Sequence, residues 1–170
     1  MYIAILLLLT MITGLNFASA PSASRTEMLH AKAAATAGQM LVAQQAAVAA
    51  QKASPGYFQA GVMMQAAITE PTWFDAAAKF ASGTDGATVV VTYFGGDNTL
   101  WQDMLAALGQ QASAYPTGGR GGAVLAGALV QGASGPYLQV QGKMAAQIAL
   151  PPAAVSGAPS GAPAIVSLLN

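Results

Sequence analysis

Apolar residues fill the start of the chain without a polar interruption. Residues 2–20 read YIAILLLLTMITGLNFASA and carry no charge. As a helix this stretch would extend about 28 Å, close to the hydrocarbon thickness of a bilayer. The pattern therefore predicts a retained anchor in a bacterial inner membrane, with a single span and a periplasmic domain. The alternative is a signal segment cleaved after residue 20, because residues 18–20 have the small-x-small form of a cleavage site.

Beyond residue 20 the apolar positions recur every three or four residues, which is the period of a helix. Ser24-x-x-Glu27 has the form of a capping box and predicts a helix start at Ser24. The apolar stripe that should meet the sheet consists of Ala33, Ala37, Met40, Leu41 and Val48. Residues 33–50 carry no charge, and Gln side chains without charged neighbours are unusual on a solvated face. We therefore predict that Gln44 and Gln45 face outward and bind a neighbouring protein; plain solvent exposure is the alternative.

The second half of the chain alternates between strand-like runs and turn residues. The patterns predict a short helix over residues 58–68, a strand over 87–94, a helix up to 111, and strands over 123–131, 137–141 and 164–168. The last strand should lie at a sheet edge, because Pro163 stands at its entrance. Short connections cannot join parallel neighbours, so the sheet should be mostly antiparallel.

These elements predict the α+β class: an N-terminal apolar helix and a long helix packed on a small, mostly antiparallel sheet, in a pilin-like outline. Residues 1–20 form the membrane anchor or signal segment. Residues 21–52 form the long helix, and residues 53–170 form an α+β globular region that packs with it as one domain.

The charge balance and the residue inventory exclude several classes of function. Six Lys plus Arg and six Asp plus Glu give a formal net charge of zero, so no basic face for nucleic acid can be assembled. The chain has no cysteine and one histidine, which excludes a disulfide framework and a zinc site rich in nitrogen and sulfur ligands. We predict no metal, no cofactor and no small-molecule substrate.

Carboxylates offer the main candidate chemistry. Two of them could act as an acid pair in glycoside hydrolysis, and the candidates are Glu70, Asp75, Asp85, Asp97 and Asp103. Each also stands at a turn or a helix start, where an acidic residue has a structural role. We therefore predict no catalytic residue and a protein that is not an enzyme, with a periplasmic cell-wall glycan hydrolase as the alternative.

The aromatic pair Trp73-Phe74, shortly after Pro71, has two interpretations. The pair could pack in the core beneath a turn, or it could be an exposed anchor for a partner, since Trp is enriched at binding hot spots. Trp73 and Phe74 therefore join Gln44 and Gln45 as candidate partner-binding residues.

Several segments match a known pattern when they are taken in order along the chain. They are the short apolar N-terminus, Met40-Leu41-Val42 in an Ala/Gln-rich helix, Glu70-Pro71-Thr72-Trp73-Phe74, a helix around residues 100–111, Ile148-Ala149-Leu150-Pro151-Pro152, and Ala164-Ile165-Val166. In this arrangement the chain resembles the PilM family of type IVb (thin) pilus biogenesis proteins, best known from conjugative plasmids. Glu70 replaces a Leu of the family pattern, and the insert of residues 153–163 is a second departure.

The resemblance implies a non-enzymatic component of type IVb pilus biogenesis. Its partners would be other pilus-assembly proteins or pilin, and it would contact the inner membrane through residues 2–20. The helix-plus-sheet outline is also similar to that of pilins, so a minor pilin-like subunit in the fibre is an alternative. The basic leader and the early acidic residue of a prepilin have no counterpart here.

Overall fold

The structure, a computed structural model, describes residues 2–63, 68, 79–114, 124–141 and 146–169, with side chains from Arg25 onward except those of residues 112–114. The chain divides into two compact units, Met1–Lys32 and Ala33–Asn170. Helix α1 (Tyr2–Ala53) provides the described part of the first unit, and its later turns belong to the second. In the first unit the described side chains, those of residues 25–32, are all exposed.

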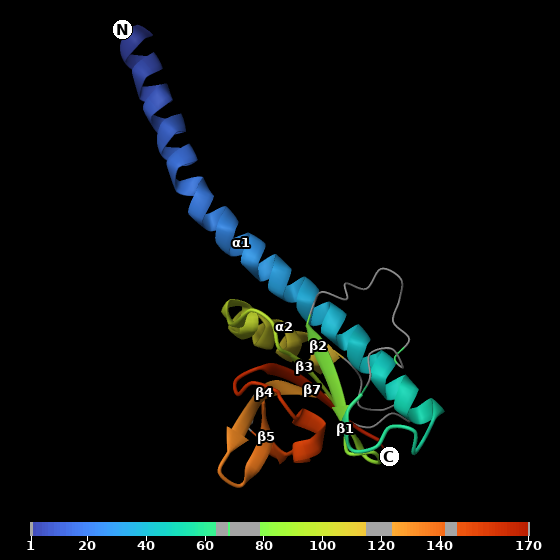
Figure 1. Ribbon diagram of the computed structural model, residues 1–170. Coiled ribbons are helices and arrows are strands. Elements are labelled where there is room, and N and C mark those ends of the chain that lie inside the picture. Colours follow the sequence, from blue (N-terminus) through green and yellow to red (C-terminus); the bar gives the residue numbers. More distant parts are fainter. Residues whose placement is uncertain (1, 64–67, 69–78, 115–123, 142–145, 170) are drawn as a thin grey trace. The chain divides into compact units, whose positions relative to one another are not determined.

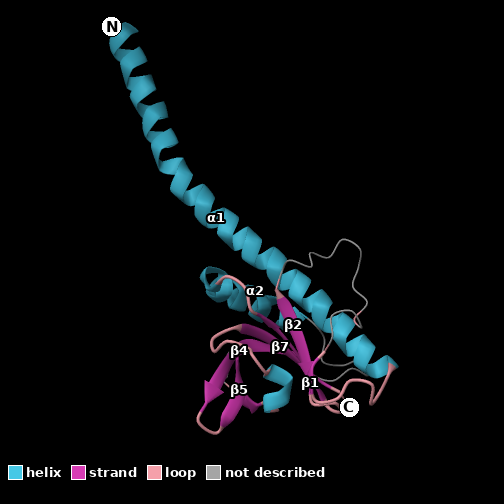
Figure 2. Ribbon diagram, in the orientation of Figure 1, coloured by secondary structure: helices cyan, strands magenta, loops and turns pink. Residues whose placement is uncertain are grey.

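The described part of the second unit is an antiparallel sheet of seven strands with the α-helices on one face (Figures 1 and 2). The strand order is β1-β2-β3-β7-β4-β5-β6. The strands are β1 (Gly61–Val62), β2 (Phe80–Thr84), β3 (Val89–Phe94), β4 (Val124–Gly132), β5 (Gly135–Val140), β6 (Gln147–Ala149) and β7 (Pro163–Leu168). The remaining elements are α2 (Trp101–Ala114) and the short 3-10 helices η3 (Asn98–Leu100) and η4 (Pro152–Val155). The predicted α+β class, with a long helix on an antiparallel sheet, is confirmed.

The helices α1 and α2 build the core on one face of the sheet. Side chains alternate between the two faces of a strand, so Val90 and Phe94 of β3 join the helix side while Val91 points to the other. Four of the five predicted stripe residues on α1 are buried there, namely Ala33, Ala37, Met40 and Leu41. The fifth, Val48, is half-buried against a neighbouring cluster on the same face. The mostly small side chains of the stripe allow α1 to lie close to the strands.

An irregular segment covers the opposite face of the sheet. Leu150, Ala154, Val155 and Ala158 are buried there in one cluster with strand residues such as Val91. This close approach requires a glycine in β2, because a Cβ on Gly83 would overlap the carbonyl oxygen of Ala154. The insert of residues 153–163 is therefore part of the core, although its composition resembles that of a linker.

Strand β7 lies in the centre of the sheet and not at its edge, so the sequence prediction is wrong at this point. It pairs with β3 on one side and with β4 on the other. Pro163 is compatible with this position because it is the first residue of the strand, where a missing N–H is tolerated. Five of the six residues in β7 are buried, as expected for a central strand.

Two predictions about helices are also wrong, one about where α1 begins and one about a short helix over residues 58–68. Helix α1 begins at Tyr2 and passes through residues 21–24 without a break, so the Ser24 motif does not start a helix. In the described part of the segment 58–68, β1 replaces the predicted helix and pairs with β2. Gly61, with φ at 147°, adopts a backbone conformation that is not helical.

The predicted inner-membrane location, with residues 2–20 retained as a single span, is wrong as well. Crossing a bilayer takes about 20 consecutive, predominantly apolar residues in a helix. Among the helices that the structure describes, none meets this requirement of length and apolar character.

Candidate partner-binding surface

Gln44 faces the sheet, and the prediction that it points outward is wrong. Its side chain is 2% exposed. The Nε2 atom donates hydrogen bonds to the carbonyl oxygen of Val90, at 2.9 Å, and to Oγ of Ser167, at 3.0 Å. Gln44 lies one helical turn from Met40 and Leu41, within the buried stripe, and the paired strands β3 and β7 provide its acceptors. The amide therefore fixes α1 to the sheet and is not available to a partner.

Gln45 is exposed, as predicted, and it belongs to a larger surface of α1. We call this surface the α1 outer face; its exposed or half-buried members are Ala34, Ala35, Gly38, Gln39, Val42, Gln45, Ala46 and Ala49. No residue from Ala33 to Gln51 is charged. A Cβ on Gly38 would meet no atom within 4 Å, so the described fold itself does not require a glycine there.

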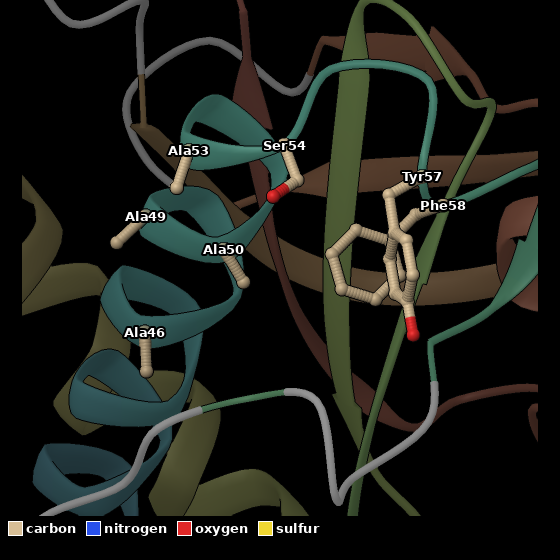
Figure 3. A pocket seen from close by; sticks show the side chains of 7 residues that line it. All are labelled: Ala46, Ala49, Ala50, Ala53, Ser54, Tyr57 and Phe58. Atoms are coloured by element: carbon tan, nitrogen blue, oxygen red, sulfur yellow. The ribbon is translucent and has the colours of Figure 1, made fainter.

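A hollow of about 490 Å³ adjoins this face at the end of α1 (Figure 3). One wall consists of helix residues and Ser54, and the other of Tyr57 and Phe58; the helix residues are Ala46, Ala49, Ala50 and Ala53. Phe58 is buried whereas Tyr57 is 68% exposed, and their rings meet edge-on with centroids 5.0 Å apart. Since every described residue that lines the hollow is uncharged, the hollow suits an apolar side chain better than a charged group.

The aromatic pair Trp73 and Phe74 lies outside the described residues. Ile68, which precedes the pair in the chain, is buried in a cluster with Ala47 and Phe58.

Three of the candidate carboxylates are described, namely Asp85, Asp97 and Asp103, and each occupies a structural position. Asp85 accepts hydrogen bonds from the backbone N–H groups of Ala87, Thr88 and Val89 and from the Thr88 hydroxyl. Burial raises the pKa of Asp85, but these hydrogen bonds outweigh it and lower the pKa from 3.8 to about 2. A general acid needs a raised pKa, so Asp85 is poorly suited to that role.

The other candidate carboxylates that the structure describes, Asp97 and Asp103, stand at the starts of helices. Asp97 caps η3 by accepting a hydrogen bond from the N–H of Thr99 at 2.9 Å. Asp103 lies in the first turn of α2, where negative charge is favoured. Glu70 and Asp75 lie outside the described residues. Within the described residues, no group of three His, Cys, Asp or Glu side chains could hold a metal ion.

Comparison of the chain with protein-family models, with curated proteins and with solved structures finds no match. The uncharged run of residues 33–50 indicated the α1 outer face in the sequence, but the run did not distinguish the buried Gln44 from the exposed Gln45.

Proposed function

We propose that the protein is a non-enzymatic component of type IVb pilus biogenesis that binds other assembly proteins through the α1 outer face. The observation that carries the proposal is the lack of charge on this face, from Ala33 to Gln51. The face opposite a helix's apolar stripe normally carries charged and polar residues, whereas the centres of protein interfaces are depleted in charge. The resemblance of the chain to the PilM family supplies the pilus setting.

The packing of α1 makes its outer face a suitable binding surface. Ala33, Ala37 and Met40 are fully buried on the opposite side, and Gln44 adds hydrogen bonds to two strands. The helix is therefore held in place before a partner arrives, and binding costs less conformational entropy. Small side chains along the outer face would allow a partner helix to approach closely.

A minor pilin-like subunit is the second candidate, and one feature of the fold favours it. The later turns of a long helix packed on an antiparallel sheet resemble the general outline of pilins. Detection of the protein in sheared, purified pili would identify it as a fibre subunit. An assembly component should instead remain with the cells.

Pilus production in cells carrying charged variants tests the proposal. Gln45→Lys and Ala49→Lys each place a cation on the α1 outer face at an exposed position. Both should leave the free energy of unfolding within ~0.5 kcal/mol of that of the parent protein. Binding to the partner should weaken by at least about tenfold, the equivalent of 1.4 kcal/mol, and pilus yield should fall.

Gln102→Lys is the matched control, because Gln102 is an exposed glutamine on the other helix, α2. Its pilus yield should equal that of the parent. Normal pilus yield from both outer-face variants would contradict the proposal.

A further inference from the structure

The strands β4, β5 and β6 present an ordered array of uncharged side chains on one face. Their register places Val130, Tyr137 and Ala149 in one row, and Ala128, Gln139 and Gln147 in the next. The alternate residues Leu129, Leu138 and Ile148 belong to the core cluster on the opposite face. We call these six residues the β4–β6 array.

The array is accessible in the described structure. Gln147 and Ala149 are exposed, and the other four members are half-buried. Strand β5 packs mainly on β4, β6 and η4, whereas helix α2 packs on β4. Helix α2 approaches the array at Gln141, where a Cβ on Gly109 would lie 3.6 Å from the Cβ of Gln141. The exposed members of the array are therefore on β6, the strand farthest from α2 in this half of the sheet.

The ring of Tyr137 is held against the backbone of β4. A Cβ on Gly132 would lie 2.9 Å from Cε1 of Tyr137 and 3.3 Å from its Cδ1, so the ring approaches this closely only because residue 132 is a glycine. A ring restrained in this way loses little conformational freedom when a ligand stacks on it.

Two amide groups lie in the row beside this ring. The Nε2 atom of Gln147 donates to Oε1 of Gln139 at 3.4 Å. The Nε2 atom of Gln139 and the Oε1 atom of Gln147 have no further hydrogen bond to a described residue. Among the described residues, the two amides thus keep three N–H donors and the Oε1 acceptor of Gln147 without a protein partner. These groups lie next to an aromatic ring, and the array has no formal charge.

We propose that the β4–β6 array binds a neutral glycan. The C–H face of a sugar ring is apolar and can stack on an aromatic ring, while its hydroxyl groups both donate and accept hydrogen bonds. Tyr137 matches the first property, and the amides of Gln139 and Gln147 match the second. An anionic ligand would require cations, which the array lacks. The surface is separate from the α1 outer face, so the two proposals stand independently.

Calorimetric titration of the purified full chain with cellohexaose and chitohexaose tests this inference. The parent protein should bind at least one of these neutral hexasaccharides. Tyr137→Ala should weaken that binding at least tenfold, and Gln147→Ala should weaken it several-fold. Tyr137→Phe keeps the ring and should bind nearly as the parent does. Gln147 is exposed, so Gln147→Ala should fold normally. It therefore tests the site even if Tyr137→Ala does not fold.

Matched controls carry the same substitutions elsewhere on the surface. Tyr57→Ala and Gln45→Ala remove an exposed tyrosine and an exposed glutamine, and both should leave the affinity unchanged. The inference is overturned if the parent binds neither hexasaccharide at millimolar concentration, or if Gln147→Ala and Tyr137→Ala bind as tightly as the parent. If the parent protein binds no sugar but self-associates, and Gln147→Ala abolishes this self-association, the array would instead be a contact between protein copies.

Discussion

Gln44 joins α1 to two strands through a single amide group, and its neighbour Gln45 makes no such contact. Gln44→Met keeps the length of the side chain but removes both donated hydrogen bonds. The buried acceptors on Val90 and Ser167 would then lose a partner, so the free energy of unfolding should fall by about 1–3 kcal/mol. Gln45→Met should change it by less than ~0.5 kcal/mol. Urea denaturation of both variants measures the difference, and equal midpoints would contradict the assigned role of Gln44.

Asp85 stabilises the turn between β2 and β3, and this contribution to the free energy of unfolding depends on pH. Asp85→Ala removes the acceptor of three backbone N–H groups, and we expect a loss of about 1–2 kcal/mol at neutral pH, comparable with the loss of a helix cap.

The lowered pKa of Asp85 fixes the direction of the pH effect. Because its pKa is about 2 in the folded protein against an ordinary 3.8, its contribution is complete above pH about 4 and is lost as the pH falls towards 2. Denaturation at pH 5 and pH 2.5 should therefore show a larger difference in stability for the parent than for Asp85→Ala. Equal pH dependence in the two proteins would rule out this contribution.

At the scale of elements, the contact between β2 and η4 depends on the absence of a side chain. Gly83→Ala would place a methyl group against the carbonyl oxygen of Ala154. To make room for the methyl group, the backbone of β2 would have to move away from that of η4. This loss of packing should destabilise the protein by about 1–3 kcal/mol or more. Gly38→Ala makes the same substitution in open space within α1 and should stabilise it by up to ~1 kcal/mol. Thermal unfolding of the two variants should move in opposite directions; two downward shifts would indicate that the space beside Gly38 is occupied.

The elements that were predicted correctly are those whose own residues show the composition or the period of a strand or a helix. Residues 87–94 are β-branched and aromatic, and β3 lies there; residues 100–108 have a helical period, and α2 lies there. Strand β2 reads FASGT, and no local preference identifies it, because it forms by pairing with β3 and by accepting η4 against Gly83. Gln44 and Gln45 are chemically identical, so only the position of the sheet determines which of them is buried.

At the scale of the whole molecule, the second unit supplies all of the described core. Every buried apolar residue in the described part of the chain lies at Ala33 or beyond. We therefore expect residues 33–170 to fold without the first unit. The free energy of unfolding should change by less than about 1 kcal/mol, which corresponds to about 2–4 °C in the melting temperature. Calorimetry of the full chain and of residues 33–170 makes the comparison; a shortened chain that fails to melt cooperatively would contradict this expectation.

The central position of β7 determines when the sheet can form during synthesis. The strands β1, β2 and β3 emerge from the ribosome first, and β4, β5 and β6 follow, but no strand pair links these two groups directly. Only β7, at residues 163–168, joins them. A nascent chain that ends before Pro163 therefore has two separate three-stranded ribbons with exposed edges, which are open to mispairing. Folding of this protein should consequently be late and slow, because its decisive contacts connect distant parts of the sequence, and chaperone binding to the nascent chain should persist until β7 has emerged.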